Sequence, residues 1–156
     1  MIMERKLELK DIAGYLPYEL KVIEYVFSEI HTIKLDIIKN LFLDRVKPIL
    51  RPLPDLYKEI TNNGSEQFIP IVELAKIAFP NIKWKLASGM CVNENLEAFE
   101  FDEGYFYSEC RNVKNIAVHS QYQLFDKLHE WKIDYRGLID ACLAVSVYDL
   151  SENPYK

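Results

Sequence analysis

The segment 47–54, KPILRPLP, constrains the fold more than any other part of this chain, because it holds three of the seven prolines. Each proline lacks a backbone N–H and restrains the residue before it to extended geometry. We therefore expect this segment to run as an extended connector outside regular secondary structure. No long Gly/Ser/Pro-rich stretch separates two cores, so residues 1–156 are expected to form a single domain, with a β-rich part at about 20–53 and a mixed α/β part at about 54–150.

Residues 20–46, which precede the connector, favour a small antiparallel β-sheet. Ile33, Leu35 and Ile37 alternate with polar residues, which is the period of a half-buried strand. The preceding LKVIEYVF is rich in β-branched and aromatic residues, although its apolar positions also fit a helix over 20–30 in part. Strand and helix both stay open for this stretch, strands being preferred, and 41–46 is expected to add a third strand.

The part after the connector mixes helices with a β-hairpin. Pro70 opens one expected helix, Asn63-Gly64 closes another, and the acidic turn before Gly104 indicates the hairpin. Ser120 and Asp134 are expected to cap two helices that form a C-terminal helical hairpin. The predicted fold class is therefore α+β: a small antiparallel sheet, helices near 54–62 and 70–79, a hairpin near 97–108 and a helical pair at 121–143. Residues 88–94 and 111–119 are expected as loops, 145–147 as a last strand and 151–156 as a polar tail.

Composition and charge narrow the classes of partner. The chain has 19 basic and 24 acidic residues, a formal net charge of -5, and binding to nucleic acid or to an anionic membrane draws its affinity from a dense basic surface. The first residues lack the apolar run of a signal peptide, and no apolar stretch approaches the ~20 residues that cross a bilayer. We expect a soluble, cytoplasmic protein without a membrane partner.

No residue pattern indicates a metal, a cofactor or a catalytic site. Zinc sites place their ligands in tight pairs, whereas the histidines and cysteines of this chain are widely spaced, and position 133 breaks the H-E-x-x-H pattern that begins at His129. The five glycines are isolated, so no phosphate-binding loop is present. We predict no catalytic, cofactor-binding or metal-binding residue and no cofactor. The positions considered and set aside are His31, His119, His129, Cys91, Cys110, Cys142 and Ser120, with the acids Glu97, Glu100, Asp102 and Glu103.

Several strings of the chain form a recognisable combination: LKDIA at 9–13, YLPYELK at 15–21, VKPILRPL at 46–53 with DL at 55–56, QLFDKLHEW at 123–131 followed by Asp134 and GLI at 137–139, and NPY at 153–155. Together they resemble a family of uncharacterised small proteins encoded by phages and prophages of gut Bacteroidetes. The resemblance covers both ends and the proline-rich centre in order, but not residues 25–45 and 81–115, and Pro54 stands where the family pattern has serine. It implies a phage or prophage origin and an intracellular setting in a bacterium, and it brings no reaction, ligand or catalytic residue.

Three functions remain, in order of preference. The first is a non-catalytic accessory or protein-interaction protein, because catalytic motifs are lacking and the 13% of aromatic residues suits contact surfaces. It implies an unidentified protein partner and leaves a homo-oligomer open. The second is a nucleic-acid-associated module, either through stacking on Tyr105-Phe106-Tyr107 or through a basic face. The third is a small hydrolase, for which a deep pocket lined by His119, His129 or the acids is required. The basic face would consist of Lys34, Lys39, Arg45, Lys47 and Arg51.

Overall fold

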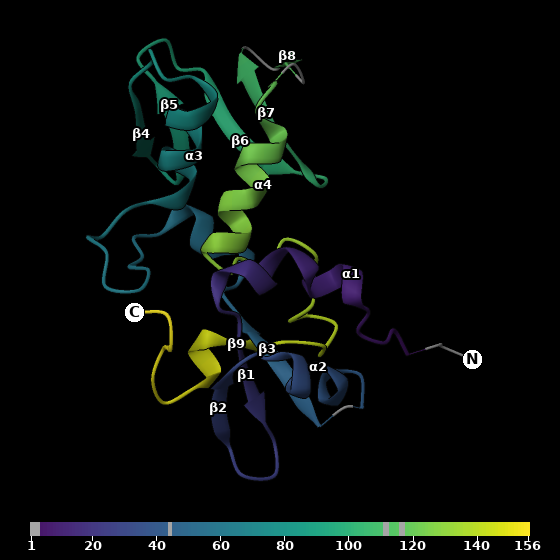
Figure 1. The fold of residues 1–156 in the computed structure, drawn as a ribbon. Coiled ribbons are helices and arrows are strands. Elements are labelled where there is room, and N and C mark those ends of the chain that lie inside the picture. The colour runs from purple at the N-terminus through teal and green to yellow at the C-terminus, as the bar shows by residue number, and fades with distance from the viewer. Residues whose placement is uncertain (1–3, 44, 111–112, 116–117) are drawn as a thin grey trace. The chain divides into compact units, whose positions relative to one another are not determined.

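The computed structural model describes residues 4–43, 45–110, 113–115 and 118–156 and has a mixed α+β fold. Its backbone contacts divide the chain into two compact units (Figure 1). The first unit combines residues 1–53 with 128–154, and the second holds 54–127 together with the last two residues. Each unit has its own small β-sheet, and the described residues contain four α-helices in all.

A four-stranded sheet in the order β2-β1-β3-β9 forms the centre of the first unit. Strands β1 (Lys21–Glu24) and β2 (Glu29–Thr32) form an antiparallel hairpin, so the preferred strand interpretation of this stretch is confirmed and the helical alternative is wrong. Strand β3 (Val46–Leu50) pairs antiparallel with β1, and the short β9 (Val145–Ser146) pairs parallel with β3. The predicted last strand at 145–147 is thereby confirmed in part.

Three expectations for residues 33–54 are wrong, and one of them is the strand expected at 41–46, of whose described residues only Val46 belongs to a strand. Residues Leu35–Leu41 form helix α2 instead of continuing a strand. Leu35, Ile38 and Leu41 recur every three residues, which suits one face of a helix, and this spacing competes with the alternation that begins at Ile33. The expected connector begins as a strand, since β3 includes Pro48. Strand β9 pairs with β3 only at Ile49 and Leu50, so the missing N–H of Pro48 breaks no bond on that side of the sheet.

The N-terminal segment packs its aromatic corner into the first core. Helix α1 (Leu9–Ile12) continues directly into the 3-10 helix η1 (Ala13–Tyr18), which contains Pro17. Tyr15 is completely buried, and its hydroxyl donates a 2.6 Å hydrogen bond to the carbonyl of Ile133. This bond ties the start of the chain to the segment after α4. The core around it contains Ile12, Leu20, Val22, Leu41, Val46, Leu50 and Leu138.

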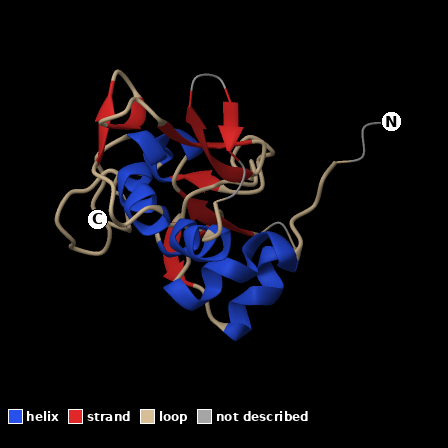
Figure 2. Ribbon diagram, turned by 90° about the horizontal axis from the view of Figure 1, so that it is seen from above, coloured by secondary structure: helices blue, strands red, loops and turns tan. Residues whose placement is uncertain are grey.

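The expected C-terminal helical hairpin is wrong in its second half. Helix α4 spans Gln121–Glu130, but residues 134–144 form turns and irregular backbone, and Figure 1 shows loop after α4. Figure 2 distinguishes the helices, strands and loops of the chain by colour. The Asp134 carboxylate does accept hydrogen bonds from the backbone N–H groups of Leu138 and Ile139, in the manner of a cap. The left-handed φ values of Gly137 and Cys142 then prevent regular helix geometry. The thiol of Cys142, which the helical interpretation places inward, is exposed.

The second unit carries a five-stranded antiparallel meander in the order β4-β5-β6-β7-β8. The predicted hairpin is confirmed as β6 (Ala98–Asp102) and β7 (Tyr105–Cys110). The predicted loop at 88–94 is wrong, because β5 (Met90–Asn93) pairs there with β4 (Trp84–Ala87). Strand β8 (Val113–Asn115) replaces part of the loop expected at 111–119, whose residues 111–112 and 116–117 lie outside the described residues.

Two helical segments of the second unit also bear on the predictions. Helix α3 (Pro70–Ala78) confirms the expected helix, begins at proline and buries Ile71, Leu74 and Ala75. It contacts β4, β5 and β6 of the sheet (Figure 1). The helix expected near 54–62 is reduced to the 3-10 helix η2 (Leu53–Tyr57). In the core, Phe106 stacks on Phe99 with ring centroids 5.7 Å apart.

The C-terminal tail is less polar than expected. After β9 comes the 3-10 helix η3 (Val147–Asp149), and then Tyr155 is completely buried in the second unit. Its carbonyl accepts a 2.9 Å hydrogen bond from the backbone N–H of Asn63. Over the described part of the chain, every helix is too short or too polar to cross a bilayer.

Candidate interaction surface

The turn of the β1–β2 hairpin exposes three consecutive apolar side chains. Strand pairing ends at Glu24 and Glu29, and residues 25–28 form the turn, in which Ser28 has a left-handed φ of 53°. Tyr25, Val26 and Phe27 are 47%, 74% and 68% exposed. Because the turn extends past the end of the sheet, the core that buries Val22 does not reach these side chains.

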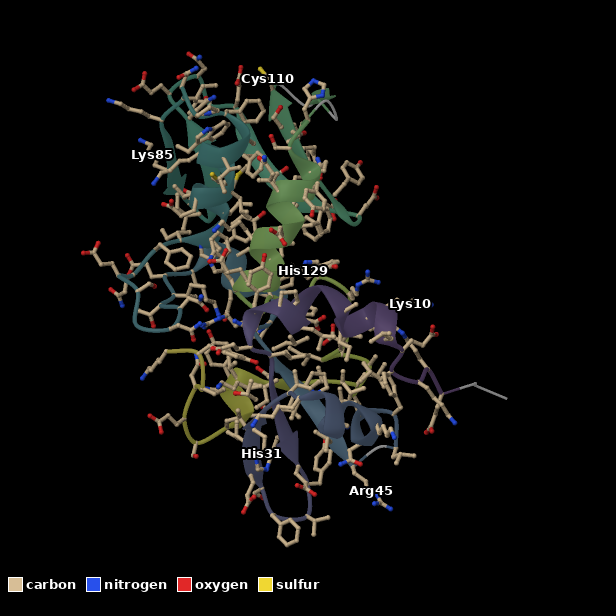
Figure 3. The ribbon with its side chains drawn as sticks, viewed as in Figure 1. Lys10, His31, Arg45, Lys85, Cys110 and His129 are labelled. Carbon is tan, nitrogen blue, oxygen red and sulfur yellow. The ribbon has the colours of Figure 1, made fainter. Side chains whose placement is uncertain are left out.

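Ile30 extends the apolar surface along β2, and we call Tyr25, Val26, Phe27 and Ile30 the hairpin patch. Ile30 is 41% exposed. The segment between α2 and β3 follows beside the turn, because the backbone N–H of Tyr25 donates to the carbonyl of Arg45. This segment exposes Phe42 and Leu43 as well. Figure 3 shows His31 and Arg45 at the same end of the first unit.

Charged side chains border the hairpin patch. The Nε2 atom of His31 lies 3.4 Å from a carboxylate oxygen of Glu29 and 3.9 Å from one of Glu24. On the other face of the sheet, the ammonium of Lys47 lies 5.2 Å from the ring centroid of Tyr25. A cation over an aromatic face at this distance restrains the ring. The patch is thus a small apolar surface with charged groups on both faces of its hairpin.

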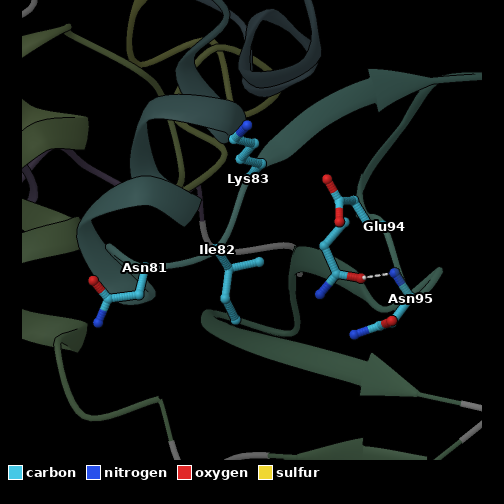
Figure 4. A pocket seen from close by; sticks show the side chains of 6 residues that line it. Asn81, Ile82, Lys83, Glu94 and Asn95 are labelled. Atoms are coloured by element: carbon cyan, nitrogen blue, oxygen red, sulfur yellow. Dashed lines mark hydrogen bonds between the residues drawn. The ribbon is translucent and has the colours of Figure 1, made fainter.

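A hollow of about 410 Å³ lies in the second unit, lined by Asn81, Ile82, Lys83, Asn93, Glu94 and Asn95 (Figure 4). The buried Asn93 side chain holds the β5–β6 turn, because its Oδ1 accepts from the N–H groups of Asn95 and Glu97 and its Nδ2 donates to the Glu97 carboxylate. The hollow is open and polar, and neither His119 nor His129 lines it. This lining does not include the groups that the hydrolase hypothesis requires.

The histidines and cysteines occupy separate environments. His129 is held inside the first unit, where its Nε2 lies 2.7 Å from the hydroxyl of Tyr135 and its ring packs edge-on against Tyr15. Cys110 ends strand β7 and is exposed, and His119 is exposed in the turn before α4. Cys91 is buried, and desolvation raises the pKa of its thiol to about 12. Among the described residues, no group of three potential ligands is placed to hold a metal ion.

The acids of the β6–β7 region have structural partners. The Glu100 carboxylate accepts a 2.8 Å hydrogen bond from the hydroxyl of Tyr107, and that of Asp102 accepts from the N–H of Glu103. Burial, together with the Glu100 carboxylate, raises the pKa of the Tyr107 phenol. Phe106 and Tyr107 are buried, so the three aromatic residues at 105–107 belong mainly to the core. They do not form an exposed platform for stacking bases.

The basic face expected for nucleic acid lacks one of its five members. Arg51 is buried, and its Nε donates a 3.0 Å hydrogen bond to the carbonyl of Trp131. Lys47 is half-buried over Tyr25, whereas Lys34, Lys39 and Arg45 are exposed. A surface that neutralises phosphates needs solvent-facing cations, and Arg51 is not one.

Lys132 is a buried charge of the first unit that no sequence pattern singled out. Lys132 has a left-handed φ of 56° and is buried, with its Nζ donating to the carbonyl of Glu130. Desolvation, reinforced by the charge of Arg51, lowers the pKa of Lys132 from 10.5 to about 8. The side chain of Lys132 and those of Arg51 and Asp134 bond to backbone groups of residues 130–139. These side chains satisfy backbone groups of an irregular segment, and no periodic pattern reveals such a role in advance.

In comparisons with known proteins, no protein-family model, no curated protein and no solved structure matches the chain.

Proposed function

We propose that this protein is a non-catalytic accessory or protein-interaction protein that binds its partner through the hairpin patch. The observation that carries the proposal is the run of Tyr25, Val26 and Phe27, exposed side by side in one turn. Consecutive exposed apolar residues oppose solubility and are retained mainly where they serve binding. Burial of Val26 and Phe27 in a partner would contribute roughly 1.5–3 kcal/mol for each side chain.

The resemblance of the sequence supports the rest of the proposal. It supports an origin in a phage or prophage and action in the cytoplasm of the bacterial host. The border of Glu24, Glu29, His31 and Lys47 would then orient the partner, because charges around an apolar centre select among partners and fix their register.

Site-specific photocrosslinking in cells of the natural host tests the proposal. A benzophenone amino acid replaces Val26 in one variant and Leu96 in a control, since Leu96 is 80% exposed but stands alone in a turn of the second unit. We expect a covalent protein adduct at position 26 and none at position 96. The absence of any adduct at position 26, or equal adducts at both positions, would contradict the proposed function.

A further inference from the structure

We propose that the partner bound at the hairpin patch is a second copy of this chain, joined by antiparallel pairing of the two β2 strands. This inference rests on the proposed function and specifies its partner. Strand β2 lies at the edge of its sheet, next to β1 alone. An edge strand presents unpaired N–H and C=O groups, and pairing with another strand satisfies them.

The hydrogen bonds of the hairpin show which residues of β2 face outward. The N–H of Ile33 donates a 2.8 Å bond to the carbonyl of Leu20, so the pair of these residues is a hydrogen-bonded pair. Bonded and non-bonded pairs alternate along an antiparallel ladder. His31 and Glu29 therefore bond toward β1, and the backbone groups of Ile30 and Thr32 point to the free edge.

Three of the usual obstacles to edge pairing are missing from β2. Its sequence, Glu-Ile-His-Thr, contains neither proline nor lysine, and its register against β1 runs without a bulge. Two other features that oppose edge-to-edge pairing are present, because β2 has only four residues and carries the charged Glu29, so a second copy has to accommodate that charge.

The charges along β2 select one register. Side chains directly opposite each other in an antiparallel pair share one face of the sheet. A two-fold axis perpendicular to the sheet therefore lies midway between the two copies of one residue, which stand opposite each other. With Ile30 on the axis, Ile30 faces Ile30 of the second copy, and Glu29 faces His31 of the second copy twice. With His31 on the axis, the two imidazoles face each other and each Glu29 faces Ile33. The first register brings each carboxylate of Glu29 to an imidazole that can pair with it, and the second register does not.

The same register covers the exposed turn. In an antiparallel pair the numbers of two opposite residues have a constant sum. With Ile30 opposite Ile30, Phe27 of one copy therefore comes beside Ile33 of the other. Phe27, which is 68% exposed, would then lose contact with water against an apolar side chain, while Val26 would come beside Lys34 of the other copy. The two four-stranded sheets would join into one continuous sheet.

Cysteine scanning tests the dimer and its register together. The exposed Cys110 and Cys142 are first replaced by serine, and Ile30→Cys, His31→Cys or Thr32→Cys is then introduced. A hydrogen-bonded antiparallel pair has its Cα atoms about 5.5 Å apart, which a disulfide spans. Under mild oxidation with copper phenanthroline we expect Ile30→Cys to form a covalent dimer, and the other two variants to remain monomeric on denaturing gels. Crosslinking at His31→Cys in place of Ile30→Cys would overturn the register.

Ultracentrifugation of the full chain supplies the second measurement. We expect a species of twice 18.4 kDa that dissociates on dilution. Glu29→Lys should raise the dimer Kd about tenfold, because the dimer holds this pair twice. Glu29→Lys combined with His31→Glu should return the Kd to within about threefold of the parent value, while Glu66→Lys in the second unit should leave it unchanged.

The outcomes separate this inference from the proposed function. A monomer at all concentrations, with a photocrosslinked adduct to a different protein at position 26, overturns the self-association and leaves the proposed function standing. A monomer without any adduct overturns both. An adduct of twice the chain mass, together with the Ile30→Cys dimer, supports both.

Discussion

At the scale of individual residues, two features distinguish this molecule: apolar side chains that are exposed and charged side chains that are buried. Val26 and Phe27 are exposed although their chemistry favours burial, and Lys132 and Arg51 are buried although theirs favours water. The side chains of Lys132 and Arg51 donate hydrogen bonds to the backbone carbonyls of Glu130 and Trp131 respectively. The exposed apolar side chains have no comparable structural use within their own unit, which is why the proposed function depends on them.

Replacement of Lys132 should change how stability depends on pH. Its pKa is lowered to about 8, so between about pH 8 and 10.5 the unfolded chain binds more protons at this group than the folded chain. The contribution of Lys132 to the free energy of unfolding therefore rises with pH over this window, and below it the group carries a constant penalty. Lys132→Met removes that penalty, on the order of 3 kcal/mol at most from the pKa difference. Loss of the bond to the Glu130 carbonyl offsets part of the gain.

Urea unfolding from pH 7 to 10.5 checks this expectation. We expect Lys132→Met to be more stable than the parent at pH 7, and the difference to decline as pH rises. Tyrosines with a raised pKa are present in both proteins, so their contribution to the pH dependence of stability cancels when the parent and the variant are compared. A control, Lys10→Met, removes an exposed lysine and should give a flat difference. A pH-independent gain in Lys132→Met would contradict the lowered pKa.

At the scale of elements, the confirmed predictions concern helices and hairpins whose hydrogen bonds join residues close together in the sequence. Helix α3 begins at a proline and follows one apolar stripe, and the β6–β7 hairpin alternates around a turn ending in glycine. The expectations that fail concern segments with distant partners. Strand β3 depends on β1 and on β9, the latter almost a hundred residues away, and the turns at 134–144 depend on the core around Leu138.

The β6–β7 turn provides a prediction at this scale. Glu103 and Gly104 have φ values of 51° and 85°, the type I′ geometry in which asparagine is favoured at the first position. Glu103→Asn is expected to increase the free energy of unfolding by about 0.5–1 kcal/mol, because it relieves the cost of a left-handed φ. Thermal or urea unfolding measures the gain. The control Glu66→Asn lies at an exposed position without a left-handed φ, and an equal gain there would argue against the turn as the cause.

At the scale of the whole molecule, the chain passes from the first unit to the second after Leu53 and returns at Leu128. Each unit has its own sheet, and each has its own buried residues. Proteins open locally in contiguous cooperative units, so a change confined to one core should loosen that unit first. Gly14 offers a suitable change, because a Cβ atom there would overlap the imidazole ring of His129 within the first unit.

Hydrogen exchange measured by mass spectrometry tests the separation of the units. Gly14→Ala is expected to lower the free energy of unfolding by about 1–3 kcal/mol and to speed exchange in β1 and β3, with β6 and β7 little affected. His129→Ala in the same chain should recover part of the loss, since it removes the overlapping ring. The matched control is Gly104→Ala, which has open space but a left-handed φ, and it should speed exchange only in the second unit. Equal acceleration in both units by both variants would contradict separate cooperative units.

From the sequence, a binding surface could be expected in general, but the residues that form it could not be named. The lack of catalytic motifs and the aromatic content favoured a binding protein, and the strand interpretation of 20–32 was right. Which aromatic residues would be exposed was not predictable, because Tyr25 and Phe27 resemble Phe99 and Phe106 in type and in alternating context. The first pair lies beyond the end of its sheet, and the second pair stacks inside a core.

The amino-acid sequence by itself determined the acidic charge, the mixed α and β composition, helix α3 and the two-residue turn before Tyr105, because these depend on residue chemistry or on bonds between near neighbours. Only the tertiary structure decided that a proline-containing segment becomes an inner strand, that Lys132 and Arg51 are buried, and that the β2 edge and its turn face solvent. Those outcomes follow from which distant segments supply strand partners and cover side chains, and such pairing is set by the packing of the whole chain.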